Sequence, residues 1–171
     1  MLSKKAKYAL QALQYLANER GHSPTLISEL ARKERIPKKF LELILLELKR
    51  HGVLQSKKGK GGGYFLGKSP AEINLGYVIR LLDGPLAPLP CVSQTAYMKC
   101  QECHDETTCG IRLVMKEVRD ATAEILDGTS LADMLKNVAR LQANGRIKTL
   151  SRRKPLQPSK SAKSHKKSST L

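Results

Sequence analysis

The stretch "KKFLELILLELKRHGVLQSKKGKGGGYFLG", residues 38–67, decides the fold because its hydrophobic period changes partway along. In residues 38–50 apolar side chains recur every three or four positions, which predicts a helix. The predicted inner face of this helix consists of Phe40, Leu41, Ile44, Leu45 and Leu48. Residues 53–67 then alternate as strand, basic glycine-rich turn and strand, which predicts a β-hairpin beside the helix.

The turn of this hairpin contains three consecutive glycines, Gly61 to Gly63. Glycines serve in a turn where the backbone needs a positive φ or approaches another group very closely. A glycine-rich loop beside lysines also suggests nucleotide binding. The order G-x-x-x-x-G-K-[ST] is absent, however, and no helix begins directly after the loop. We therefore predict that the hairpin is a wing.

Two amphipathic segments precede the third helix. Residues 3–21 predict a helix of about four turns that ends at Gly21. The following segment predicts a short helix with Ser23 as its cap and Pro24 in its first turn. The inner face of this second helix is predicted to comprise Leu26, Ile27, Leu30 and Ala31.

A short helix, a tight turn near residues 34–37 and a longer helix with a cationic outer face are typical of a helix-turn-helix. With the hairpin added, the predicted fold class is mainly α with a small β-hairpin wing. It is a winged helix-turn-helix followed by a long dimerisation helix. The alternative for this region is a plain three-helix bundle with solvated charges.

Eight residues of this region are candidates for contact with double-stranded DNA. They are Lys38, Lys39, Glu42 and Lys49 on the third helix, and Lys57, Lys58, Lys60 and Tyr64 on the hairpin. Lysines suit phosphate oxygens, and the two near the helix N-terminus also suit guanine. Glu42 is repelled by phosphate but can accept a hydrogen bond from cytosine N4. Its alternative is an intrahelical pair with Lys38 or Lys39.

The net charge of +16 is unevenly distributed along the chain. Residues 1–68 carry 15 basic and 5 acidic residues, whereas residues 69–144 carry 7 basic and 10 acidic residues. Residues 145–171 carry 9 basic residues and no acidic one. This end is poor in large apolar residues, so residues 143–171 are predicted to be a disordered basic tail. The tail either attracts phosphate non-specifically or acts as a solubilising extension.

The middle of the chain predicts three more helices. The first covers residues 69–84, with Leu75, Val78, Ile79 and Leu82 on its buried side, and Pro85, Pro88 and Pro90 follow it. A long helix over residues 110–128 has an apolar stripe of Ile111, Val114, Met115, Val118, Ala121, Thr122 and Ile125. So narrow a stripe predicts pairing with a second copy, which suits a palindromic operator; the alternative is packing within the chain. A short helix follows, capped by Thr129 or Ser130.

All the cysteines lie in residues 91–110, at Cys91, Cys100, Cys103 and Cys109. The chain has neither a long apolar segment nor a secretory leader, which predicts a reducing, cytoplasmic location. Clustered cysteines there are more often metal-binding or catalytic than disulfide-bonded. The spacing C-x8-C-x2-C-x5-C contains one C-x-x-C, and thiolates suit zinc, iron–sulfur clusters and copper(I). His104 is either a further ligand or a solvent-facing residue.

Four segments together resemble the IscR-type winged-helix regulators. They are the run that begins at Lys4, the "KKGKGGGY" wing, the "GPLAPLPC" lead-in to the cysteine loop and the "CGIRLVMKEV" start of the long helix. The resemblance covers about residues 1–137. This family includes iron–sulfur, nitric-oxide and cysteine-metabolism sensors. In its cluster-bearing members three cysteines and a non-cysteine ligand hold a 2Fe–2S or 4Fe–4S cluster, and the state of that cluster changes the affinity for DNA.

The resemblance implies a cluster-switched, homodimeric regulator, and it assigns roles to the cysteines. Cys91 matches the first family cysteine, Cys103 the middle one by spacing and Cys109 the last. The family's fourth-ligand positions hold Arg112 and Tyr8 here, and neither is a ligand. Cys100 is the obvious replacement, with His104, Asp105 and Glu106 as alternatives. A 2Fe–2S cluster is favoured over 4Fe–4S, and the competing hypothesis is a cluster-free regulator that is zinc-bound or thiol-redox.

No Ser–His–Asp or Cys–His signature, Walker loop or H-E-x-x-H motif is present, so we predict neither catalysis nor a small-molecule substrate. A module that docks on a protein and on RNA is a further alternative.

The predicted organisation is a winged head (1–68), a linking helix with a Pro-rich lead-in (69–90), the cluster-binding loop (91–110), the dimerisation helix with a short helix (110–142) and the tail (143–171).

Overall fold

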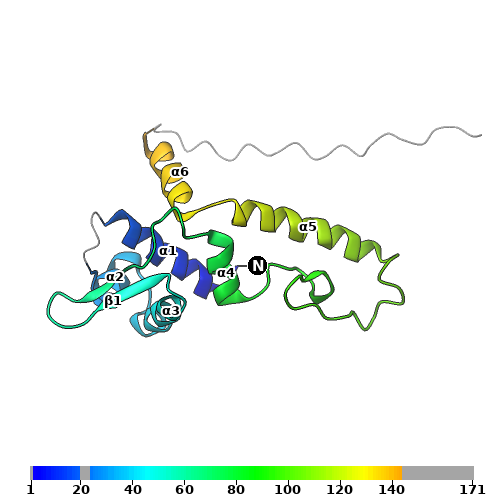
Figure 1. The fold of residues 1–171 in the computed structure, drawn as a ribbon, viewed down its shortest axis with the longest axis horizontal. Helices are drawn as coiled ribbons and strands as arrows, with labels where there is room; N and C mark the ends of the chain where they lie inside the picture. Colours follow the sequence, from blue (N-terminus) through cyan, green and yellow to red (C-terminus); the bar gives the residue numbers. More distant parts are fainter. Residues whose placement is uncertain (1, 20–23, 144–171) are drawn as a thin grey trace, which may run out of the picture.

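The computed structural model describes residues 2–19 and 24–143 of the 171-residue chain. The elements are α1 (Lys4–Asn18), α2 (Ile27–Glu34), α3 (Lys38–Arg50), β1 (Leu54–Lys57), β2 (Gly63–Leu66), α4 (Leu75–Asp83), the 3-10 turn η1 (Pro90–Val92), α5 (Gly110–Asp127) and α6 (Leu131–Ala143). Figure 1 shows α1–α4, the hairpin and α6 gathered in one head, from which α5 and the cysteine loop extend as an arm. The predicted fold class is confirmed.

The inner face of α3 forms the centre of the head's core. Leu41, Ile44, Leu45 and Leu48 are completely buried, as predicted. Each such side chain contributes about 1.5–3 kcal/mol by its removal from water. Phe40 is only partly buried, and its ring meets that of Tyr8 edge to face with 5.8 Å between the centroids.

The start of α2 differs from the prediction. Pro24 lies outside any helix, and α2 begins only at Ile27. The cause is the backbone of Thr25, which exchanges two hydrogen bonds of 2.9 Å with Tyr64 of β2. This pairing holds the segment extended against the hairpin until the helix starts. Leu26, predicted on the inner face, is 54% exposed in consequence.

The ends of the first and last helices also differ from the prediction. The first helix stops at Asn18, before Gly21, and both Gly21 and the predicted cap Ser23 lie outside the described residues. Ala143, assigned to the tail by the sequence, is the last residue of α6. The rest of the predicted tail, residues 144–171, lies outside the described part of the chain.

The three glycines of the hairpin have the uses that the sequence predicts. Gly61 has a φ of 75°, in the left-handed region. A side chain on Gly62 would strike the Lys57 carbonyl, and one on Gly63 would strike the carbonyl of Thr25. The glycine at position 63 therefore allows the Thr25 segment to lie against β2, which joins the wing to the start of α2.

Replacement of Gly63 by alanine is expected to destabilise the head more than replacement of Gly61 does. Gly61→Ala meets open space and suffers only backbone strain, about 1–2 kcal/mol. Gly63→Ala adds a clash with backbone that cannot move without breaking the Thr25–Tyr64 pair. Urea unfolding of both variants and the wild type measures the difference. Equal midpoints for the two variants would show that the close approach has no energetic role.

The segment before α4 is paired to the turn between α5 and α6. The Leu131 amide donates to the Ile73 carbonyl at 2.8 Å, and the Ala132 amide donates to the Pro70 carbonyl at 3.0 Å. These bonds keep the residues before Asn74 out of the helix, so α4 starts at Leu75 and not at Ser69 as predicted. Asn74 caps it by accepting from the Tyr77 amide at 2.9 Å.

Helix α6 returns the chain to the head after the arm. Leu131 is completely buried in the same core as α1 and α3, and Met134 packs against that core. The predicted cap is present at Ser130, whose hydroxyl accepts from the Asp133 amide at 3.1 Å. None of the helices in the described ranges combines the length and apolar character needed to cross a membrane.

Candidate functional site

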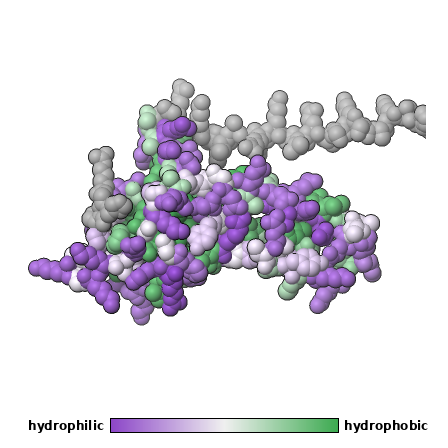
Figure 2. All heavy atoms as spheres, viewed as in Figure 1, coloured by the Kyte–Doolittle hydropathy of each residue, from purple (hydrophilic) through white to green (hydrophobic). Residues whose placement is uncertain are grey.

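The candidate DNA-contacting residues lie on α3 and on the adjacent hairpin. Lys38, Lys39 and Glu42 are exposed on the first turns of α3. The hairpin lysines are also exposed; they are Lys57, Lys58 and Lys60. Figure 2 shows this hairpin as a hydrophilic projection from the head. The structure therefore places these six side chains at the surface, on two elements that lie next to each other.

Two other candidates have structural contacts as well. The Lys49 ammonium donates to the Ser56 hydroxyl at 2.7 Å and so ties the end of α3 to β1. Tyr64 is partly buried against the core, and its backbone carries the pairing with Thr25. Lys49 thus holds the wing to α3 and Tyr64 holds it to the segment before α2, roles that the sequence pattern did not reveal.

The four cysteines line one cavity of about 360 Å³ beside the N-terminus of α5. Cys91 is buried in η1, whereas Cys100, Cys103 and Cys109 are half-buried. The cavity is roughly ten times the ~30 Å³ share of one water molecule, which is more room than a single ion needs. Within the described residues, no three Cys, His, Asp or Glu side chains are already arranged around one ion.

The four thiols of this cavity suit soft metals, which include both zinc and the irons of an iron–sulfur cluster. A mononuclear zinc site needs four ligands around one point, whereas thiolates hold a cluster at separate irons with sulfide between them. Besides the four thiols, the lining offers the carboxylates of Glu102, Asp105 and Glu106 and the imidazole of His104. The residues present therefore fit the group that the sequence predicts, with the four cysteines as its candidate ligands.

Cys109 has the most favourable surroundings for a thiolate. It stands at the N-cap of α5, where the amide of Arg112, the thiol of Cys103, the amide of Ile111 and the Arg112 charge lower the pKa of the Cys109 thiol. The neighbouring Cys109 thiol is the main cause that raises the pKa of Cys103, and the Cys103 thiol donates to the Asp105 carbonyl at 3.3 Å.

Cys100 has a different environment. The Glu102 amide favours its thiolate, but the hydrogen bond to the Glu102 carboxylate, burial and that negative charge together raise the pKa of Cys100. The thiol donates to Glu102 at 3.3 Å. Binding of a metal here would have to displace this hydrogen bond and remove the proton.

The alternative fourth ligands are occupied or exposed. Asp105 accepts from the Thr107 amide at 2.9 Å and from the Thr107 and Thr108 hydroxyls, and these bonds lower the pKa of its carboxyl. Glu106 accepts from the Tyr97 hydroxyl at 2.8 Å and faces Arg112 at 3.9 Å. His104 is exposed at the edge of the cavity. Cys100 and these three alternatives all line the same cavity.

Two arginines of α5 fasten η1 to the helix, and the sequence reasoning assigned neither a role. Arg112 donates to the carbonyl of Cys91 at 3.3 Å. Arg119, which is 9% exposed, donates to the carbonyl of Val92 at 2.7 Å and also binds Asp120. Their spacing of seven residues, which places both on one face of a helix, was the signal available in the sequence. The position of Cys91 is thereby tied to α5.

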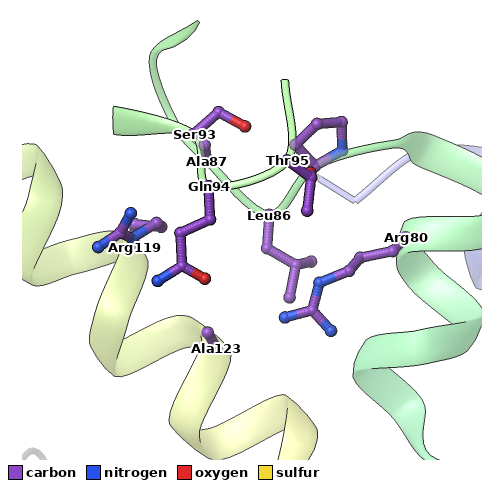
Figure 3. A pocket seen from close by; sticks show the side chains of 9 residues that line it. Arg80, Leu86, Ala87, Ser93, Gln94, Thr95, Arg119 and Ala123 are labelled. Atoms are coloured by element: carbon purple, nitrogen blue, oxygen red, sulfur yellow. The ribbon is translucent and has the colours of Figure 1, made fainter. Parts of the chain in front are cut away.

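The far end of α5 is fastened to the head by an ion pair. The Arg80 guanidinium of α4 donates to both oxygens of Asp127, at 2.5 and 2.7 Å. Gly76 makes room for this clasp, because a side chain there would collide with the Asp127 carboxylate. Figure 3 shows Arg80 and Arg119 on opposite sides of a cavity of about 30 Å³, which is room for one water molecule. The arm and α4 are therefore packed closely.

Asp127→Asn is expected to lower the free energy of unfolding at pH 7 by about 0.5–1 kcal/mol, because the pair is partly exposed. Arg80 holds the pKa of Asp127 below its ordinary value. Its stabilising contribution is therefore complete above about pH 4 and is lost as the pH falls through the folded-state pKa. Urea unfolding at pH 7 and at pH 2 measures this, and the difference between variant and wild type should vanish at pH 2. If the difference in the free energy of unfolding persists at pH 2, the effect of the substitution does not come from the charge of Asp127.

The apolar stripe of α5 is exposed on the described chain. Ile111 is 67% exposed, Val114 55%, Val118 45% and Ile125 60%. Four large apolar side chains at helical spacing on one face are unusual on a protein surface. This face is on a different side of α5 from the arginines that hold η1, so the head and the loop leave it uncovered.

The winged head and the long exposed helix define a DNA-binding regulator of the winged helix-turn-helix class. The chain belongs to the Rrf2 family of transcriptional regulators, whose model, described as an iron-dependent transcriptional regulator, matches residues 2–137. DNA binding follows from this membership, and the predicted family resemblance is confirmed.

Individual relatives agree with this membership. The chain is 46% identical to the rrf2-like HTH-type transcriptional regulator of Rhodobacter capsulatus over 138 residues, which cover 79% of this chain and 92% of the relative. It is 30% identical to the structure of CymR, the global cysteine regulator of Bacillus subtilis, with a TM-score of 0.67 and coverage of 80% and 97%. The IscR structure of T. potens is 27% identical, with a TM-score of 0.65 and coverage of 83% and 90%. The relatives are transcriptional regulators, and the chain is likewise not an enzyme.

Proposed function

We propose that this protein is a homodimeric regulator whose affinity for a palindromic operator is switched by an iron–sulfur cluster. The observation that carries the proposal is the single cavity lined by all four cysteines at the N-terminus of α5. The candidate ligands are Cys91, Cys100, Cys103 and Cys109. We favour 2Fe–2S over 4Fe–4S, and zinc is the alternative. The protein would act in the cytoplasm, together with the DNA that it binds.

The proposed DNA contacts are divided between α3 and the wing. Helix α3 enters the major groove, with Lys38 and Lys39 on phosphate or guanine and Glu42 on cytosine. The hairpin lysines at positions 57, 58 and 60 reach phosphates or the minor groove alongside. Lys49 and Tyr64 border this surface and support the wing. The mixture of cations and one carboxylate allows both affinity and selection of sequence.

Coupling between the cavity and the DNA-binding head follows the contacts along α5. A bound cluster supplies an iron centre that an oxidant, nitric oxide or iron shortage can remove. Cys91 is held through η1, where Arg112 binds the Cys91 carbonyl and Arg119 binds the Val92 carbonyl. Cys109 is held at the N-cap of α5. Loss of the cluster from Cys91 and Cys109 would shift η1 against α5, and the ion pair of Arg80 with Asp127 would carry this shift to α4.

The exposed stripe of α5 supports the dimer. Pairing of two such stripes buries side chains that are otherwise about half or more exposed, and a two-fold axis along α5 places two heads for two half-sites. Each head then carries one α3. A change in α5 at the cavity would alter the distance between the two heads. A palindromic operator is bound tightly only when this distance matches the spacing of its half-sites.

The test is an anaerobic purification followed by absorption spectroscopy and a count of iron, acid-labile sulfide and zinc per chain. Iron and sulfide in equal amounts, with visible charge-transfer bands, support the proposal, and their number per chain separates 2Fe–2S from 4Fe–4S. Titration of operator DNA with loaded and stripped protein then measures the coupling. Zinc alone, or loaded and stripped proteins of equal affinity, would contradict the cluster switch.

A thiol switch is the second candidate, and it is favoured because Cys103 and Cys109 line the same cavity. The Cys109 thiolate would attack a peroxide and pass to a disulfide with Cys103, so that the two thiols give up two electrons and two protons while the peroxide is reduced to water. Mass spectrometry of metal-free protein after peroxide treatment would detect a loss of two hydrogen atoms. A Cys103→Ser variant should not form this bond.

Replacement of the wing lysines tests the DNA surface. The triple variant Lys57→Gln, Lys58→Gln and Lys60→Gln is expected to bind every duplex more weakly at low salt, with an affinity that falls less steeply as salt rises. The salt slope should decrease by about 0.9 for each phosphate that the variant no longer neutralises. Fluorescence anisotropy at several salt concentrations measures it, with Lys136→Gln on α6 as the control. An unchanged salt slope would show that the wing lysines do not contact the DNA phosphates.

A further inference from the structure

The outer face of α3 carries two leucines that the core does not use. Leu43 is 61% exposed and Leu46 is 41% exposed. They lie opposite the buried residues of the same helix, so packing within the head does not explain them. Scattered leucines on a surface need no explanation, but this pair occupies adjacent turns of the helix expected to meet DNA.

The two leucines belong to one straight ridge along α3. Lys39, Leu43, Leu46 and Arg50 follow each other at spacings of four, three and four residues, which places all four on a single line of the helix. All four are exposed. The ridge spans about 16 Å from Lys39 to Arg50, at 1.5 Å per residue. It thus has a cation at each end and apolar side chains in the middle.

This order of side chains matches the cross-section of a major groove. The groove is about 12 Å wide, with phosphates on both edges and base edges on its floor. With α3 in the major groove as proposed above, the end cations of the ridge would reach the phosphate edges and its middle would meet the floor. The apolar groups on that floor are the C5-methyl groups of thymine, which Leu side chains contact without leaving a hydrogen bond unmade.

We propose that Leu43 and Leu46 contact thymine methyl groups in the operator and so determine part of the sequence that the protein selects. This inference rests on the proposed placement of α3 in the major groove. Glu42 lies beside the ridge, one turn from Leu46, so a cytosine that donates to its carboxylate would neighbour a selected thymine. The wing lysines contribute affinity but not this selection.

Deoxyuridine scanning tests the proposal. The full chain is used to select a duplex from random sequences, and each thymine of the half-site is then replaced by deoxyuridine, which lacks only the methyl group. For the wild type, at least one replacement is expected to weaken binding by about three- to fivefold, the value of one buried methyl group. In Leu43→Ala or Leu46→Ala the same replacement should have no effect, because the contact is already absent.

The variants are expected to fold, since both side chains are exposed and alanine favours helix. Leu141→Ala, which removes a leucine of α6 that is 55% exposed, is the matched control and should keep the full deoxyuridine effect. Equal deoxyuridine effects in wild type and both α3 variants would overturn the proposal. So would variants that bind DNA normally but differ in sedimentation, because the leucines would then be a protein contact. Failure of the wild type to select any duplex would instead overturn the proposed function.

Discussion

The double variant Val118→Glu, Ile125→Glu is expected to be monomeric and to bind the operator at least about 100-fold more weakly than the wild type. The two residues lie seven positions apart on α5 and are 45% and 60% exposed. Two carboxylates placed on this face would meet their own copies across a two-fold axis. The second half-site is then no longer held at high effective concentration, which removes the gain from bivalent binding.

The fold of this variant should be intact, because neither residue contributes to the head's core and glutamate is a good helix former. Analytical ultracentrifugation measures the mass of the particle, and anisotropy with half-site and full-site duplexes separates the two contributions. Lys136→Glu on the exposed face of α6 changes the net charge by the same amount and is the control. If the variant remains a dimer with unchanged affinity for the operator, the dimer interface does not include the α5 stripe.

The second large effect is expected in the cysteine loop. Cys91→Ser, Cys103→Ser and Cys109→Ser should each lose nearly all bound iron and sulfide after anaerobic purification, because a hydroxyl is a poor ligand for the soft iron of a cluster. The operator affinity of each variant should equal that of stripped wild-type protein. Relative to loaded protein, a coupling of 1–3 kcal/mol corresponds to a shift of about 5–150-fold.

Cys100→Ser separates the possible fourth ligands. If this thiol completes the site, the variant loses iron as the other three do. If Asp105, Glu106 or His104 completes it, Cys100 is not a ligand, and iron stays bound with unchanged charge-transfer bands. Gln101→Ala, at the exposed neighbouring position, should keep both iron and affinity and is the control. Variants that retain the loaded protein's affinity without iron would show that the loop does not switch DNA binding.

The wing and its glycines were predictable because they obey local rules. The spacing of apolar residues changes from every three or four positions to every second position, and this change marks the end of α3 and the start of the hairpin. Gly61 needs a positive φ, which few other residues adopt. The end of α5 at Gly128 and the cap at Ser130 follow in the same way from residues next to each other in the chain.

The errors lie where distant backbone segments pair. Pro24 and Ser69 are both in positions that suit the first turn of a helix. Each helix starts later because its lead-in is held elsewhere, Thr25 by Tyr64 and Pro70 by Ala132. Such pairs lie about 40 and 60 residues apart in sequence, and local propensity carries no information about them.

The sequence by itself determined the class of this protein: periodicity marks the helices and the wing, the uneven charge marks a basic head, and four close cysteines mark a soft-metal or thiol site. Only the tertiary structure decided how these parts are joined. It brings the cysteines to one cavity, fastens η1 to α5 through Arg112 and Arg119, fastens α5 to α4 through Arg80 and Asp127, and leaves the α5 stripe uncovered. The reason is physical. Periodicity and spacing reflect interactions between residues that are close in the sequence. These contacts instead join segments that are far apart in the sequence and meet only when the chain packs.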